Sequence, residues 1–136
     1  MVADKAQTRR AVIVLTDGAD TASQYTSQQV ARIASAIDVP VYIFAVGDGL
    51  APALDDEKGA EQSTLALLAR ATGGDLFVAN TRQSIDKAVK RVTEELRHQY
   101  VLAFEAAQEN GMRRLEVRTR RPELKVKSRN WYQGTE

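Results

Sequence analysis

Asp17 directly follows the apolar run Ala11–Thr16, and of all the residues it is the one best placed for binding chemistry. A strand that is apolar on both faces is typical of a parallel sheet covered by helices. Ligands of such sheets bind beyond the carboxyl ends of the strands. Several further acidic residues should lie at this end, and their oxygens would suit Mg²⁺ or Ca²⁺: Asp20, Asp48, Asp55, Asp56 and Glu57.

Asp17 also has a purely structural interpretation. Aspartate favours turns because its side chain accepts hydrogen bonds from the backbone amides of its own turn. Calcium needs about six to eight oxygens, and no loop of this chain has the alternating acidic spacing that supplies them. Two hypotheses for Asp17 therefore stand side by side, a metal ligand and a turn residue.

The remaining candidates for catalysis lack supporting residues. The sole histidine, His98, falls at the end of a predicted helix. At this position an imidazole is expected to interact with the last backbone carbonyls of the helix rather than to act as a general base. Gly47-Asp48-Gly49 and Gly73-Gly74 complete no Walker or dinucleotide motif and indicate turns. The absence of cysteine excludes a disulfide scaffold, a thiolate metal site and a cysteine nucleophile. We therefore expect no enzymatic activity.

Basic residues gather in the last third of the chain. They alternate with other side chains and are followed by two aromatic residues; the set is Arg113, Arg114, Arg118, Arg120, Arg121, Lys125, Lys127 and Arg129. Such a ribbon would bind phosphate backbones or acidic surfaces. A charged outer face of a hairpin is also simply solvated and resists aggregation. Because 19 basic and 18 acidic residues give a net charge of only +1, we expect no nucleic-acid partner.

Apolar periodicity predicts alternating strands and helices over the first 98 residues. The predicted strands are Ala11–Thr16, Val39–Gly47 and Asp75–Ala79, and the predicted helices are Ser27–Ile37, Ser63–Ala71 and Ser84–His98. Thr26 or Ser27 should cap the first helix and Ser63 the second. Gly73-Gly74 should end the second helix, because glycine adopts the backbone conformation that terminates helices.

The pattern changes from helical to extended at residue 99. Tyr100–Glu105 reads as a strand, and Asn110-Gly111 is a strong turn signal. Alternation then continues through Leu115–Thr119 and Leu124–Ser128. We expect residues 1–98 to form an α/β region and residues 99–136 to form an antiparallel β-hairpin extension packed on it.

Three segments carry a family resemblance. VIVLTDGAD resembles the fourth-strand segment of the von Willebrand factor type A (VWA) fold, and LALLARATGGDLFVA resembles its penultimate helix, Gly-Gly turn and last strand. With the basic tail RRPELKVKSRNWY, the chain is similar to bacterial secreted proteins called VWFA-related. The resemblance covers roughly Arg10 to Tyr132 and implies a three-layer, Rossmann-like, mostly parallel sheet flanked by helices.

The same resemblance implies a metal-dependent adhesion site that is incomplete here. VWA domains hold Mg²⁺, Mn²⁺ or Ca²⁺ with an Asp-x-Ser-x-Ser motif, which this sequence lacks, together with a Thr from a second loop and the Asp of the TDG turn. Only Asp17 maps onto a metal-site position, and Thr16 and Gly18 shape its turn. The chain therefore resembles the C-terminal half of a VWA domain, with a metal expected in the full-length parent and none tightly bound here.

The VWA topology also implies an exposed strand. Its sheet order is 3-2-1-4-5-6, so Ala11–Thr16 would lie beside a strand that this sequence lacks and would become an edge. Apolar edges without lysine, proline or a bulge tend to associate. We expect this edge either to pair with a second copy, giving a homo-oligomer, or to be covered by the chain's own C-terminal strands.

Three function classes remain open. The first is a non-enzymatic, adhesion-type protein-interaction module whose parent domain binds a partner's acidic side chain through the metal. The second is a structural fragment that self-associates through the exposed strand without metal or partner. The third is an α/β enzyme or phosphoacceptor regulatory domain. No apolar run reaches the roughly 18 residues of a membrane span, and the resemblance places the parent outside the cell or in the envelope of a bacterium.

Overall fold

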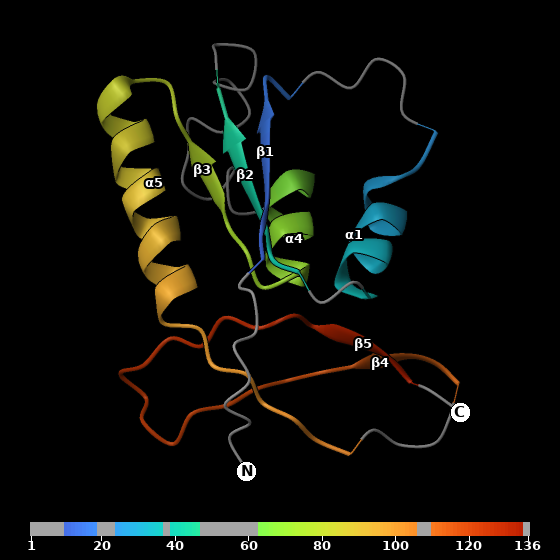
Figure 1. Cartoon of the computed structure of the whole chain (residues 1–136). Coiled ribbons are helices and arrows are strands. Elements are labelled where there is room, and N and C mark those ends of the chain that lie inside the picture. The colour runs from blue at the N-terminus through green and yellow to red at the C-terminus, as the bar shows by residue number, and fades with distance from the viewer. Residues whose placement is uncertain (1–9, 19–23, 37–38, 47–62, 106–109, 135–136) are drawn as a thin grey trace.

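The protein has a mixed α/β fold with a parallel sheet and a separate antiparallel pair of strands (Figure 1). The computed structural model describes residues 10–18, 24–36, 39–46, 63–105 and 110–134. The elements in chain order are β1 (Val12–Thr16), α1 (Ser27–Ala36), β2 (Val41–Ala45), α4 (Thr64–Ala71), β3 (Leu76–Val78), α5 (Arg82–Arg97), β4 (Gly111–Arg114) and β5 (Trp131–Gly134).

The parallel sheet has the order β1-β2-β3 within the described residues, with β2 at its centre. Val12 aligns with Val41 and Thr16 with Ala45, so β1 and β2 pair along their whole length without a bulge. The three predicted strands and their parallel arrangement are confirmed, although each observed strand is shorter than predicted.

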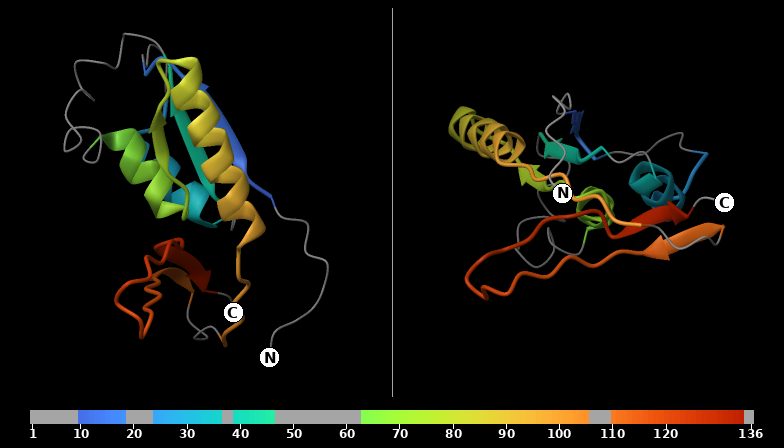
Figure 2. Two further views of the ribbon diagram at one scale, coloured as in Figure 1. Left: turned by 90° about the vertical axis from the view of Figure 1, so that its left-hand side faces the viewer. Right: turned by 60° about the horizontal axis from the view of Figure 1, so that its bottom comes forward.

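Helices pack against both faces of β2, because its side chains alternate between two apolar clusters. Tyr42 and Phe44 face α5, where they cluster with Ala88 and Val92. Val41 and Ile43 point the other way and cluster with Ala69 and other residues of α4 and α1. Figure 2 shows α5 on one side of the sheet and α4 with α1 on the other.

Side-chain caps fix where the helices begin. Ser63 accepts a hydrogen bond from the backbone of Ala66, as predicted, and Thr26 accepts one from Gln29. The predicted start of α5 at Ser84 is wrong, because Thr81 is the N-cap. Ser84 is instead the third helical residue, and it returns a hydrogen bond to the backbone of Thr81 in a capping box.

The C-terminal region departs most from the sequence prediction. Residues 100–105 form no strand, and Asn110-Gly111 is not the turn of a hairpin, because β4 begins at Gly111 and pairs antiparallel with β5. An antiparallel pair is therefore present, but its partners are residues 111–114 and 131–134. The predicted strands Leu115–Thr119 and Leu124–Ser128 are not strands in the structure, and Leu124 instead closes a turn by donating a backbone hydrogen bond of 3.1 Å to the Arg121 carbonyl.

Candidate functional site

Asp17 lies exposed at the carboxyl end of β1, where the sequence placed it. The turn after it is closed by a hydrogen bond of 2.9 Å from the Gly18 amide to Thr16 Oγ1. Gly18 has a φ of 82°, a left-handed conformation that favours glycine. Thr16 and Gly18 thus shape the turn as predicted.

The metal site predicted around Asp17 stays a prediction. Asp20, Asp48 and the loop acids Asp55, Asp56 and Glu57 lie outside the described residues. Among the described residues, no group of three or more His, Cys, Asp or Glu side chains is arranged to hold a metal ion. One carboxylate supplies fewer oxygens than Mg²⁺ or Ca²⁺ requires.

The strand that leads to Asp17 carries an exposed apolar surface. Ile13 is 51% exposed and Leu15 is 70% exposed. The register aligns them with Tyr42 and Phe44, so all four side chains lie on the sheet face that α5 covers at β2. Because α5 packs over β2 and β3, no described helix covers the β1 part of this face, and Val89 of α5 is also 50% exposed.

Within the part of the chain that the structure describes, the outer edge of β1 is open as well, because β1 pairs with β2 alone. The expectation that the C-terminal strands cover this edge is wrong, because β4 and β5 pair with each other below the sheet (Figure 1). We call the open edge together with exposed Ile13 and Leu15 the β1 surface.

A network of charges joins the C-terminal region to the α/β region at the opposite end of the sheet. Lys127 Nζ lies 2.8 Å from Asp75 Oδ2 and 2.7 Å from Glu95 Oε1. Arg91 contacts the same two carboxylates at 3.1 and 3.2 Å, and its guanidinium lies over the Phe77 ring. The sequence prediction missed this network; the spacing of Arg91 and Glu95, one helical turn apart, was the available signal.

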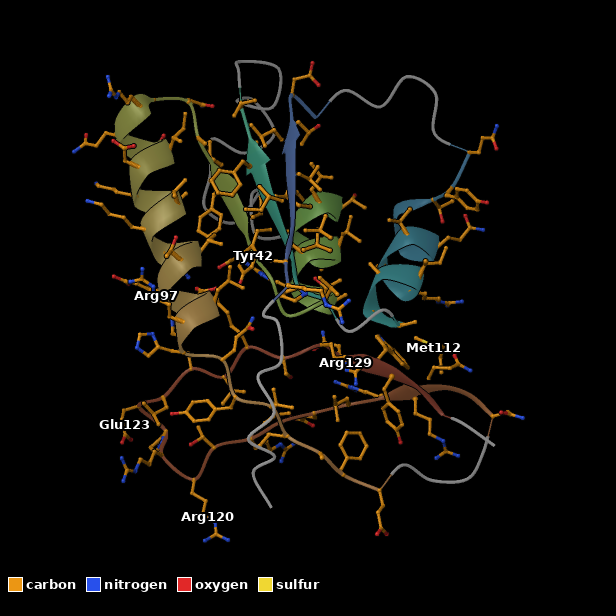
Figure 3. All side chains as sticks on the ribbon, viewed as in Figure 1. Tyr42, Arg97, Met112, Arg120, Glu123 and Arg129 are labelled. Carbon is orange, nitrogen blue, oxygen red and sulfur yellow. The ribbon has the colours of Figure 1, made fainter. Side chains whose placement is uncertain are left out.

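Tyr42 lies beside this network and is 1% exposed. Burial, followed by the negative charge of Glu95, raises the pKa of Tyr42 to about 12. The phenol therefore remains neutral well above its usual range. Figure 3 shows Tyr42 at the lower part of the sheet, on the side of the chain's C-terminal region.

The predicted basic ribbon is divided among several environments. Arg118 pairs with Glu116 at 2.7 Å, and this pairing lowers the pKa of Glu116. Lys127 belongs to the charge network, whereas Arg120 lies at the tip of the C-terminal region (Figure 3). His98 caps α5, with Nδ1 2.8 Å from the Glu94 carbonyl oxygen, which confirms the predicted helix-end role.

Comparison with known proteins gives a similarity to a solved structure. No protein-family model and no curated protein matches the chain. The crystal structure of a protein described as an uncharacterized membrane spanning protein from Vibrio fischeri is similar, with a TM-score of 0.51 and 21% sequence identity. The match covers 65% of this chain and 48% of that chain, so the chain spans about half the length of that structure.

This relationship concerns the fold alone, because the sequence identity is low. The mixed α/β arrangement, with its three-stranded parallel sheet and two-stranded antiparallel sheet, is what the structure and the match support. Among the described helices, none is long and apolar enough to cross a membrane.

Proposed function

We propose that the chain is a non-enzymatic protein-interaction unit that associates with another polypeptide through the β1 surface. The observation that carries this proposal is the exposure of Ile13 and Leu15 on a strand whose neighbour β2 is buried throughout. In this proposal the sheet and its helices correspond to the C-terminal part of a three-layer, Rossmann-like VWA domain.

Two features of the β1 surface would act together in such an association. The open edge offers backbone N–H and C=O groups, which an added strand pairs with. The apolar face offers burial of Ile13 and Leu15, and each such side chain contributes about 1.5–3 kcal/mol when fully buried. A partner that adds a strand and covers this face would use both.

The metal belongs to the full-length parent in this proposal, and Asp17 is the only residue that we assign to it. Titration calorimetry with Mg²⁺, Mn²⁺ and Ca²⁺ tests the assignment. If the chain binds a divalent ion, Asp17→Ala should abolish the binding. Unchanged affinity in that variant would remove Asp17 from the metal hypothesis.

The first partner to test is a second copy, because every copy carries the same open surface. We would measure the solution mass by sedimentation velocity from low to high micromolar concentration. We expect a mass that rises with concentration in the wild type and remains monomeric in Ile13→Lys/Leu15→Lys. Leu67→Lys is the matched control, since Leu67 of α4 is 57% exposed but lies outside the β1 surface.

Self-association without a metal or a foreign partner is the second candidate, and the same observation favours it. The two candidates differ in their response to a chelator. Association that persists in EDTA supports self-association through β1, whereas association that requires a divalent ion supports the adhesion-type module. A wild-type chain that stays monomeric in both conditions would contradict the use of β1 by a second copy.

A further inference from the structure

A second candidate binding surface lies at the far end of the molecule from Asp17. A cleft of about 1020 Å³ opens between the α/β region and two extended segments of the C-terminal region. We call residues 115–119 the first arm and residues 124–128 the second arm. Residues from both arms line the cleft, together with Gly73 and Leu76 from the α/β region and Trp131 from β5.

The arms have strand-like sequences but do not pair with each other. Leu115 donates a backbone hydrogen bond of 2.8 Å to the Asn130 carbonyl, where the arms leave β4 and β5. Among the described residues, no backbone hydrogen bond joins residues 116–119 to residues 124–128. Leu124 and Val126 are 53% and 44% exposed, although their alternation is that of a half-buried strand.

The second arm nevertheless is held in place at its end. Asn130 donates a backbone hydrogen bond to Ala71 at the end of α4, and Thr72 forms an isolated β-bridge with Arg129. Lys127 is fixed by Asp75 and Glu95. The cleft is therefore bounded by anchored segments.

The charge of the cleft is predominantly positive. Its basic lining residues are Arg70, Arg91, Arg114, Lys125 and Lys127, and its acidic lining residues are Asp75 and Glu116. Arg91 and Lys127 are neutralised by Asp75 and Glu95, and Glu116 pairs with Arg118. The positive charge that an anionic ligand would meet therefore comes from Arg114 and Lys125.

We propose that this cleft binds an extended, acidic polypeptide segment that adds as a strand to the arms. The unpaired arms supply backbone partners, and Arg114 and Lys125 supply charge complementarity. The apolar residues Val117, Val126 and Trp131 would receive alternate side chains of the segment. Nucleic acid is less favoured, because Trp131 is the one aromatic residue among the described residues of the lining and single strands need successive stacking surfaces.

A labelled peptide of alternating glutamate and valine is the probe. Fluorescence anisotropy measures its binding to the full chain, and the emission of Trp131 reports occupancy of the cleft, because Trp131 is the only tryptophan. We expect saturable binding, a shift in Trp131 emission, and affinity that falls as salt concentration rises. The reversal Arg114→Glu/Lys125→Glu should weaken binding at least ~10-fold.

Lys90→Glu is the matched control, because Lys90 is an exposed cation on α5 outside the cleft lining. Circular dichroism confirms that each variant is folded. The proposal is overturned if the peptide does not bind, if Lys90→Glu weakens binding as much as Lys125→Glu alone, or if oligothymidylate binds more tightly than the peptide. The test of the cleft is separate from the test of the β1 surface, because Ile13→Lys/Leu15→Lys should leave peptide binding unchanged.

Discussion

Neighbouring strands β1 and β2 have similar apolar sequences but opposite environments. VIVLT of β1 is largely exposed, whereas all five residues of VYIFA in β2 are buried. The difference comes from position, because β2 has a strand on each side and helices over both faces. An apolar run therefore identifies a strand, while neighbouring elements decide whether it is core or surface.

Among the substitutions that compare β1 with β2, truncation of Phe44 in β2 should cause the largest loss in the free energy of unfolding. Phe44 is 4% exposed, and its ring lies 5.4 Å from that of Phe77, so Phe44→Ala would leave a cavity. We expect a loss of about 3–5 kcal/mol in the free energy of unfolding. Urea denaturation followed by circular dichroism measures it. A loss below about 1 kcal/mol would show that β2 is no more a core than β1.

Tyr42 gives a second test of the buried environment of β2, because its raised pKa makes the stability of the protein depend on pH. Its pKa is raised to about 12 in the folded protein, against 10.0 ordinarily, so folding favours the neutral phenol. The stabilisation is fully present below pH 10 and is lost as pH rises to about 12, where the folded protein also deprotonates. Two pH units correspond to about 2–3 kcal/mol.

We expect Tyr42→Phe to remove this loss of stability between pH 10 and 12. The measurement is urea denaturation across this range, with phenolate absorbance recorded in parallel. Tyr25→Phe is the control, because Tyr25 is 62% exposed and its removal should leave the loss in place. An identical pH dependence in wild type and Tyr42→Phe would contradict the assignment.

Local signals predicted the α/β region well. The apolar runs around Val12–Thr16 and Val41–Ala45 and the periodicity of the helices were sufficient to locate these elements. The start of α5 was misplaced because Ser84 and Thr81 are both good capping residues. Only the reciprocal geometry of their side chains distinguishes the N-cap from the third residue of the helix.

Long-range contacts explain what the sequence did not predict. The alternation of residues 115–128 indicates strands, but a strand forms only where another strand pairs with it. The pairing in this region is instead between β4 and β5, which precede and follow this segment in the sequence. The pairing of Lys127 with Asp75 joins residues 52 positions apart, which no local pattern reveals. The turn at Asp17 was predicted correctly, whereas the acidic residues expected beside it lie outside the described ranges.

Lys127 tests how firmly the C-terminal region is attached to the α/β region. Lys127→Ala removes both contacts of the ammonium and leaves Asp75 and Glu95 with Arg91. We expect a loss of about 1 kcal/mol in the free energy of unfolding, since the side chain is partly exposed. The loss should shrink in high salt. Lys125→Ala is the matched control and should be neutral; equal effects from both lysines would contradict the network.

Truncation of Leu15 in β1 should have the smallest effect on the free energy of unfolding of the monomer, in contrast to truncation of Phe44 in β2. Because Leu15 is 70% exposed, Leu15→Ala should change the free energy of unfolding by no more than about 0.5 kcal/mol at low protein concentration. If copies associate through β1, the wild-type melting temperature rises with protein concentration, because binding stabilises the folded state by mass action. Leu15→Ala should then flatten that rise. A concentration dependence that the variant leaves intact would mean that association uses a different surface, and that exposure of β1 has another cause.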